Sequence, residues 1–211
     1  MKNKFLAVFL SICLFQPLLA ENLNIQSSEI FIDKKSRLTI FKGEVIAKDY
    51  KNNTFKSEYA EYKKDQKFLK SKGDTSILTS EGYFLSGANI VFDNKNKFIK
   101  SDEKAIIKDL ENNNIYLENF EYSTENNFFK STGKIKIVDS KSNSYNFSQV
   151  YIDEKKREII GTDIKAFLNQ ESFKINSDNK PRVFANTVKI GNQESEFTKS
   201  IFTLCDYRKK D

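Results

Sequence analysis

The 211-residue sequence contains no histidine and no tryptophan, and it has only two cysteines, two prolines and seven glycines. The absence of histidine removes the commonest general base and the commonest metal ligand. Two cysteines are too few for a thiolate metal cluster, and the scattered glycines form no phosphate-binding loop. We interpret the many carboxylates as solvated surface, because they fall in turns and at outward positions. The sequence therefore predicts a protein that is not an enzyme and that carries no metal or cofactor.

Long apolar runs are missing after the N-terminus. Residues 1–20 combine a charged start, Lys2 and Lys4, with an apolar stretch over residues 5–19 and a small residue, Ala20. This pattern predicts a signal peptide that is cleaved before Glu21, and the apolar stretch is short for a membrane span. An uncleaved N-terminal anchor is the alternative. The mature protein is then expected to be exported and soluble.

The charge balance excludes a strong nucleic-acid binder. The whole chain has 35 basic and 29 acidic residues, and the leader removes only the two lysines Lys2 and Lys4. The remaining excess is small and interspersed with Asp and Glu, whereas a nucleic-acid surface gathers its basic residues on one face. A weak attraction to anionic lipid phosphates is compatible with this balance. We predict no nucleic-acid partner.

Cysteine usage adds one indication about partners. Cys13 lies in the leader and is lost on cleavage, which leaves Cys205 alone near the end of the sequence. An odd thiol in an oxidising compartment indicates a disulfide with another chain or with a cysteine further on. A buried free thiol at Cys205 is the alternative.

Apolar residues recur every thirty positions along the chain. Three series keep this step: Ile25, Phe55, Leu85, Ile115, Tyr145 and Ile175; Ile32, Tyr62, Phe92, Tyr122 and Ile152; and Ala47, Ile77, Ile107, Ile137 and Phe167. Polar residues share the period, as in Lys70-Ser71, Lys100-Ser101 and Lys130-Ser131. Such a pattern predicts one supersecondary unit copied in tandem, each copy burying its apolar face against its neighbours.

Two clusters of turn-forming residues fall in each thirty-residue unit. The first clusters begin at positions 33, 63, 93, 123 and 153, and the second at positions 49, 79, 109, 139 and 169. Asp, Asn, Ser and Gly favour turns, so each unit has room for two strands of roughly seven to twelve residues. Alternating apolar and polar residues indicate strands with one face buried and the other exposed to solvent. Each unit is therefore predicted to be an antiparallel β-hairpin.

The second strand of each unit is predicted to bend near a recurring glycine. Paired apolar residues at its start, as in Phe128-Phe129, give way to strict alternation after positions such as Gly43 and Gly133. This change of pattern is typical of a β-bulge. We expect very little helix, a loop at 177–181, and further strands at 182–190 and 195–204. The predicted fold is all-β, with one domain over 21–204 and a tail or junction at 205–211.

The repeated pattern resembles that of a known family. Residues 29–33, 38–45 and 55–62 are similar to the opening of the OstA-like domain found in the lipopolysaccharide-transport proteins LptA, LptC and LptD. The resemblance extends over most of residues 25–170. It implies an antiparallel β-jellyroll shaped like a half-open V, whose apolar interior holds the acyl chains of lipopolysaccharide. It also implies terminal strands that pair edge to edge with the next domain.

Residues 200–206 resemble the segment that joins the LptD jellyroll to its cysteine-bearing region and outer-membrane barrel. The resemblance therefore favours the N-terminal domain of an LptD-type protein, associated with the outer membrane, and it would explain Cys205 through cysteines further on. The usual LptD cysteine near the mature N-terminus is absent here. A free-standing LptA-type periplasmic bridge protein is the alternative.

The candidate lipid-binding residues are apolar and lie on the predicted inner face: Ile30, Ile32, Tyr62, Ile90, Phe92, Phe120, Tyr122, Val150 and Ile152. Periodicity alone leaves open whether they line a groove or fill a closed core, because both arrangements bury the same positions. Two further classes remain as alternatives. One is a structural or adhesin protein built from parallel β-solenoid coils, and the other is a carbohydrate-active enzyme with carboxylates that meet only in space.

Overall fold

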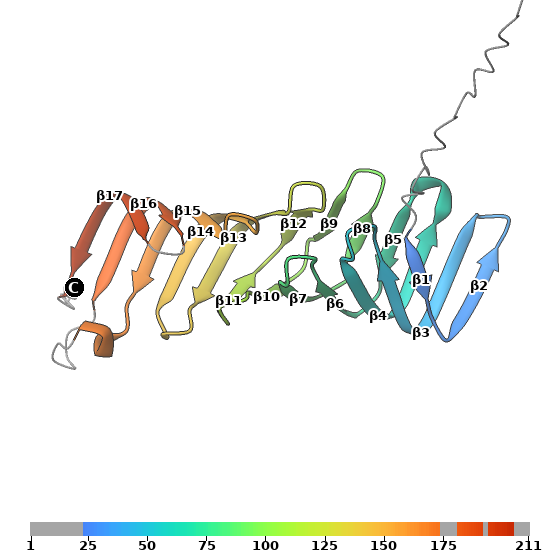
Figure 1. The fold of residues 1–211 in the computed structure, drawn as a ribbon, viewed down its shortest axis with the longest axis horizontal. Coiled ribbons are helices and arrows are strands. Elements are labelled where there is room, and N and C mark those ends of the chain that lie inside the picture. The colour runs from blue at the N-terminus through green and yellow to red at the C-terminus, as the bar shows by residue number, and fades with distance from the viewer. Residues whose placement is uncertain (1–22, 174–180, 192–193, 205–211) are drawn as a thin grey trace, which may run out of the picture.

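The computed structural model describes residues 23–173, 181–191 and 194–204. These residues form 17 β-strands and two short 3-10 segments, η1 (Lys64–Gln66) and η2 (Gln170–Phe173) (Figure 1). Every strand pairing in this part of the chain is antiparallel. The all-β antiparallel prediction is confirmed, and the parallel coils of the solenoid alternative are wrong.

The strands form two layers. Five strands belong only to layer I: β2 (Glu29–Asp33), β5 (Phe68–Ser71), β8 (Val91–Asp93), β9 (Phe98–Ser101) and β12 (Phe120–Ser123). Five belong only to layer II: β1 (Asn24–Gln26), β6 (Asp74–Leu78), β7 (Phe84–Ala88), β10 (Ala105–Lys108) and β11 (Asn114–Leu117). Hydrogen bonding runs from β5 to β8 and from β9 to β12 in layer I, and from β6 to β7 and from β10 to β11 in layer II.

Seven longer strands pass through both layers and join them at the two ends of the molecule: β3 (Leu38–Lys48), β4 (Thr54–Lys63), β13 (Phe128–Val138), β14 (Ser144–Asp153), β15 (Glu158–Phe167), β16 (Arg182–Ile190) and β17 (Ser195–Thr203). Between β4 and β13, each predicted long strand is instead broken into two short ones, so a single hairpin contributes to both layers. Figure 1 shows the resulting elongated body, with β2 near one end and β17 at the other.

The line where the layers meet is a crease marked by bulges. The register of β3 against β4 shifts between Lys42 and Val45, and that of β13 against β14 shifts between Thr132 and Ile135. Gly43 and Gly133 lie at these shifts with φ of 69° and 100°, a conformation that glycine adopts without strain. The predicted bulges beside the recurring glycines are confirmed.

The turns at the far edge of layer II repeat one hydrogen-bonding pattern. In the turn at 49–53, Asp49 Oδ1 accepts bonds from the backbone N–H groups of Lys51 and Asn53, and Asn53 Nδ2 donates to Asp49 Oδ2 over 2.7 Å. Equivalent bonds hold the turns at 109–113 and 139–143. Asn53 Oδ1 then accepts from the N–H of Ser80 in the next turn, which ties successive units together. Aspartate and asparagine suit these turns because they hydrogen-bond to nearby backbone.

Alternate residues from both layers face inward and form one continuous core. Its largest fully buried side chains include Phe55, Leu69, Ile77, Leu85, Ile107 and Ile115, and Tyr83 of the layer II turn at 79–83 lies against Phe129 of layer I. This burial explains the thirty-residue period, because equivalent inward positions stack along the molecule.

Candidate functional site

All nine candidate residues lie on the inner face of layer I. Strand register aligns Ile32, Tyr62, Phe92, Tyr122 and Ile152 in one row across the layer, with Thr39, Leu69, Ile99 and Phe129 between them. Ile30 pairs with Phe41 in the neighbouring inward row, and Val150 pairs with Ser131 in that row further along. The period therefore places these side chains on one face, as predicted.

Burial divides the nine residues into two groups. Six of them are at most 3% exposed and pack within the core: Ile90, Phe92, Phe120, Tyr122, Val150 and Ile152. Tyr62 is half-buried, whereas Ile30 is 54% exposed and Ile32 is 69% exposed. The middle of the molecule is therefore a filled sandwich, and among the nine residues only Ile30 and Ile32 of β2 are largely exposed. Lipid contact by any of the nine stays a prediction.

The two layers are offset along the molecule. Turns of layer II contact turns of layer I that lie about 47 and about 75 residues later, as shown by Ser80 with Asn127 and by Thr79 with Glu154. In the described part of the chain, no hydrogen bond joins a layer II turn to the layer I turn at 33–37, and Ile30 and Ile32 of the adjoining β2 are 54% and 69% exposed.

A buried carboxylate holds the two layers together where turns of layer I meet turns of layer II. We call this line of contacts the seam. Glu154, in the layer I turn at 153–157, is 3% exposed. Its Oε2 accepts a 2.8 Å bond from the Tyr122 hydroxyl, and its Oε1 accepts a 2.9 Å bond from Thr79 Oγ1 of layer II. Burial raises the pKa of Glu154, against the opposing effect of these donors. Burial also raises the pKa of Tyr122 far above its usual value, so the phenol remains a donor.

Lys51 makes a second seam contact. Its Nζ donates to the carbonyl oxygens of Thr124 and Glu125 at 2.5 and 2.7 Å and lies 3.3 Å from Asn127 Oδ1. Asn127 also donates to the Tyr122 hydroxyl over 3.3 Å, which connects this contact to the Glu154 cluster. Neither Glu154 nor Lys51 was among the sequence candidates. Their only signal in the sequence is a charged residue at a turn position, and several turns of the repeat carry one.

Both ends of the molecule present strands that are paired on one side. Among the described strands, β1 and β2 pair only with β3, and β17 pairs only with β16. Apolar side chains are exposed on these terminal strands, with Phe31 at 51%, Ile201 at 67% and Phe202 at 53%. An edge strand with unpaired backbone groups can accept a further strand.

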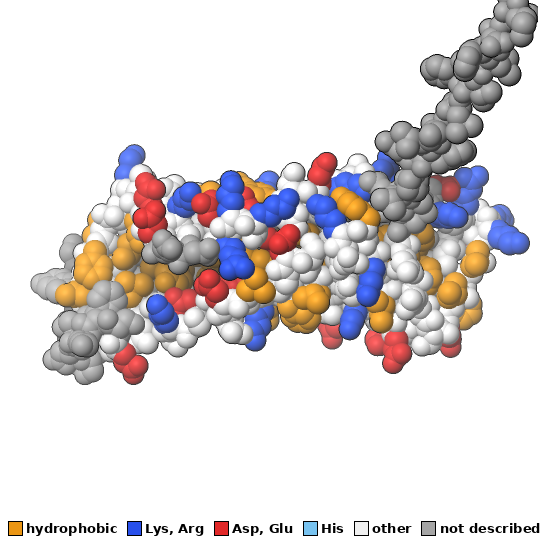
Figure 2. Space-filling view, in the orientation of Figure 1, with side chains coloured by type: hydrophobic (Ala, Val, Ile, Leu, Met, Phe, Trp, Pro, Cys, Tyr) orange, Lys and Arg blue, Asp and Glu red, His pale blue; other side chains and the backbone are white. Residues whose placement is uncertain are grey.

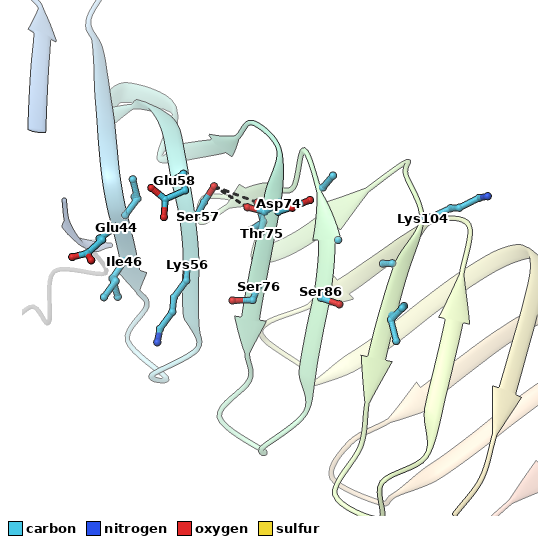
Figure 3. Close-up of a pocket in the computed structure, with 15 residues that line it drawn as sticks. Glu44, Ile46, Lys56, Ser57, Glu58, Asp74, Thr75, Ser76, Ser86 and Lys104 are labelled. Carbon is cyan, nitrogen blue, oxygen red and sulfur yellow. Dashed lines mark hydrogen bonds between the residues drawn. The ribbon is translucent and has the colours of Figure 1, made fainter. Parts of the chain in front are cut away.

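A large cavity lies elsewhere, on the outer face of layer II. It is a trough of about 1000 Å³ across β3, β4, β6, β7 and β10 (Figure 3). Two rows of outward side chains border it: Ile46, Lys56, Ser76, Ser86 and Ile106 in one, and Glu44, Glu58, Asp74, Ala88 and Lys104 in the other. The small Ser76 and Ser86 leave space between larger neighbours. Alternation along the strands cannot predict this trough, because it marks these positions only as solvent-facing.

Two predicted features lie outside the described residues, namely the signal peptide at 1–20 and Cys205 in the tail. Among the residues that are described, no helix is long and apolar enough to cross a membrane. The described part of the chain also has no group of three or more acidic or cysteine side chains placed to hold a metal ion.

The comparisons with known proteins gave matches among solved structures. No family model matches the chain, and no curated protein matches it. Among solved structures, the chain is similar to LptH from Pseudomonas aeruginosa, described as the LptA-homologous periplasmic component of a lipopolysaccharide transport device. The identity is 12%, the match covers 67% of this chain and 82% of that one, and the TM-score is 0.29. At these values the similarity supports no functional inference.

Proposed function

We propose that this protein is a periplasmic lipopolysaccharide-transport component that holds acyl chains against the inner face of layer I. The observation that carries the proposal is the exposure of Ile30 and Ile32 on β2, at one end of two neighbouring inward rows whose later members, such as Phe92 and Phe120, are buried. Isolated exposed apolar residues are ordinary, but here the two exposed residues lie on the inner face that forms the core further along the layer. The resemblance of the repeat pattern to the OstA-like domain supports the same function.

The buried members of the row have a different role in this proposal. Phe92 and Tyr122 are each 1% exposed, so a lipid can reach them only when the layers separate. Ile30 and Ile32 are accessible without any rearrangement. The first contact with acyl chains therefore falls at β2, and deeper contacts require the seam at Glu154 and Lys51 to open.

Edge-to-edge pairing is the second part of the proposal. A strand from a neighbouring transport protein would add to the outer edge of β2 or β17 by backbone hydrogen bonds. Pairing at β2 would also extend the apolar row beyond Ile30 and Ile32. The partners proposed here are lipopolysaccharide and other lipopolysaccharide-transport proteins.

Site-specific photocrosslinking tests the lipid contact. A photoreactive residue at position 32 should form adducts with lipopolysaccharide, whereas one at position 31 should form few. Phe31 is the matched control, because it is adjacent, 51% exposed and on the opposite face of β2. Equal adducts at both positions, or none at position 32, would contradict the proposal. Adducts at Phe92 would show in addition that the core opens.

The type of transport protein requires a separate test. The N-terminal domain of an LptD-type protein, associated with the outer membrane, is our proposal, and it rests on residues 200–206 and on Cys205. A free-standing LptA-type protein is the second candidate, and it is supported by the two terminal strands β2 and β17, which are the outermost strands of the described residues. Mass spectrometry of non-reduced protein from cells would separate them, since an LptD type should have Cys205 in a disulfide with a later cysteine.

A further inference from the structure

The turns of layer I nearest the β2 end are rich in basic residues. The three turns at 33–37, 63–67 and 93–97 together contain eight basic and three acidic residues. The four layer II turns at 49–53, 79–83, 109–113 and 139–143 contain two basic and five acidic residues. The overall excess of positive charge is small, so this distribution concentrates it at one edge of layer I. We call the three basic turns the basic rim.

Strand register places the turns of the basic rim in a row. Asp33 pairs with Leu38, Leu38 with Lys63, Lys63 with Phe68, Phe68 with Asp93 and Asp93 with Phe98. Consecutive turns are two strands apart, which corresponds to roughly 10 Å at the usual strand spacing. The cations are therefore arranged along an edge, and Figure 2 shows Lys and Arg side chains around the β2 end of the molecule.

The three acidic residues of the rim already have partners. Asp33 accepts bonds from the backbone N–H groups of Lys35 and Ser36, and Asp93 accepts from those of Lys95 and Asn96. Asp65 forms a 2.6 Å ion pair with Arg37.

Five lysines of the rim are less engaged. Lys34, Lys35, Lys63, Lys64 and Lys95 are exposed, and none forms an ion pair with a carboxylate in the described part of the chain. The rim thus presents positive charge that its own acidic residues do not neutralise.

The basic rim adjoins the exposed apolar surface. Ile32 directly precedes the turn at 33–37, and the half-buried Tyr62 directly precedes the turn at 63–67. Apolar inner surface and cationic edge therefore meet along one line at the β2 end of layer I. A ligand that touches both must join a negative headgroup to apolar chains.

We propose that the basic rim binds the phosphate groups of lipopolysaccharide while its acyl chains lie against Ile30 and Ile32. This inference rests on the proposed function and adds a headgroup site to it. A lipopolysaccharide anchor carries phosphates and acyl chains on one sugar core, so charges along an edge can act together with the apolar face. The charge complementarity favours this anionic lipid over an uncharged chain.

Binding of purified lipopolysaccharide to the full chain tests the site. The rim variant Lys34→Gln, Lys35→Gln, Lys63→Gln and Lys64→Gln should bind about tenfold more weakly than wild type, since each exposed charge contributes modestly. The matched control is Lys108→Gln, Lys130→Gln, Lys136→Gln and Lys165→Gln, which removes four exposed lysines away from the rim. The control should change the affinity less than about twofold, and added salt should weaken the wild type more than the rim variant.

Two further ligands separate the possible failures. Dephosphorylated lipopolysaccharide should bind wild type about as weakly as the rim variant binds the phosphorylated form. If wild type binds both forms equally, or if both quadruple variants lose the same affinity, the basic rim is not a phosphate site although the proposed function stands. If wild type binds neither form, the proposed function itself fails. Binding to phosphatidylglycerol vesicles as tight as to lipopolysaccharide would overturn the assignment of the lipid.

Discussion

Thr79 Oγ1 donates a 2.9 Å hydrogen bond to Glu154 Oε1, although the two residues are 75 positions apart and belong to opposite layers. Tyr122 donates to the other oxygen of the same carboxylate over 2.8 Å. A buried carboxylate without partners would cost several kcal/mol, so these two donors make its position tolerable. The seam between the layers is thus built around a buried acidic group, and its stability should depend on pH.

Glu154→Gln tests this dependence. Burial raises the pKa of Glu154 above its ordinary 4.5, so the folded state holds the proton more tightly than the unfolded chain does. The associated stabilisation is fully present below about pH 4.5 and is lost as the pH rises through the folded-state pKa. Urea unfolding of wild type should show this decline in the free energy of unfolding, and Glu154→Gln should lack it.

Glu81→Gln is the control for the pH experiment. Glu81 lies in the layer II turn at 79–83 and is exposed. Replacing Glu81 with glutamine should leave the decline in unfolding free energy with rising pH largely as it is in wild type. If the Glu154 and Glu81 variants show the same pH profile as wild type, the protonation of Glu154 does not contribute to the stability of the seam.

Lys51→Met tests the second seam contact. The substitution keeps most of the aliphatic chain but removes the Nζ that donates to the carbonyl oxygens of Thr124 and Glu125. Hydrogen bonds from a charged donor contribute about 1.5–3 kcal/mol, so unfolding in urea should show a loss in this range. Lys48→Met, at an exposed position at the end of β3, should change stability by less than about 0.5 kcal/mol. Equal losses would mean that Lys51 acts only as a surface residue.

The sequence predicted the elements of this fold well where local chemistry determines them. The strands expected at 182–190 and 195–204 are observed as β16 (Arg182–Ile190) and β17 (Ser195–Thr203). The turns at 49–53 and 109–113 form where the sequence has Asp and Asn, because these side chains form hydrogen bonds within the turn. The nine candidate residues share one face, because alternation along a strand determines the face.

The arrangement of the layers could not be predicted from the sequence. Alternation gives the same signal in both layers, so it could not show that hairpins break near Ser71 and Ser101 and cross from one layer to the other. It also could not give the offset between the layers, or show that Phe92 is buried while Ile32 is exposed. That offset depends on contacts such as Thr79 with Glu154, between residues far apart in the chain.

Phe92→Ala tests whether the middle of the molecule is a closed core. Phe92 is 1% exposed, so its truncation should cost about 3–5 kcal/mol of unfolding free energy. Phe84→Ala on the outer face, where the side chain is 46% exposed, should cost about 1 kcal/mol or less. Similar small losses for both variants, measured by chemical denaturation, would show that Phe92 lines an open channel instead.

Gly161→Ala tests how tightly the inner face of β15 is packed. A Cβ at position 161 would overlap the ring of Phe147, which is 5% exposed. Overpacking of this kind typically costs about 1–3 kcal/mol, and the loss should appear in thermal and urea unfolding. Phe147→Leu replaces the ring with a smaller side chain and leaves space for the added methyl group. In that background, Gly161→Ala should therefore lower the free energy of unfolding less than it does in wild type. If the two losses simply add, the close approach of Gly161 and Phe147 does not determine the packing here.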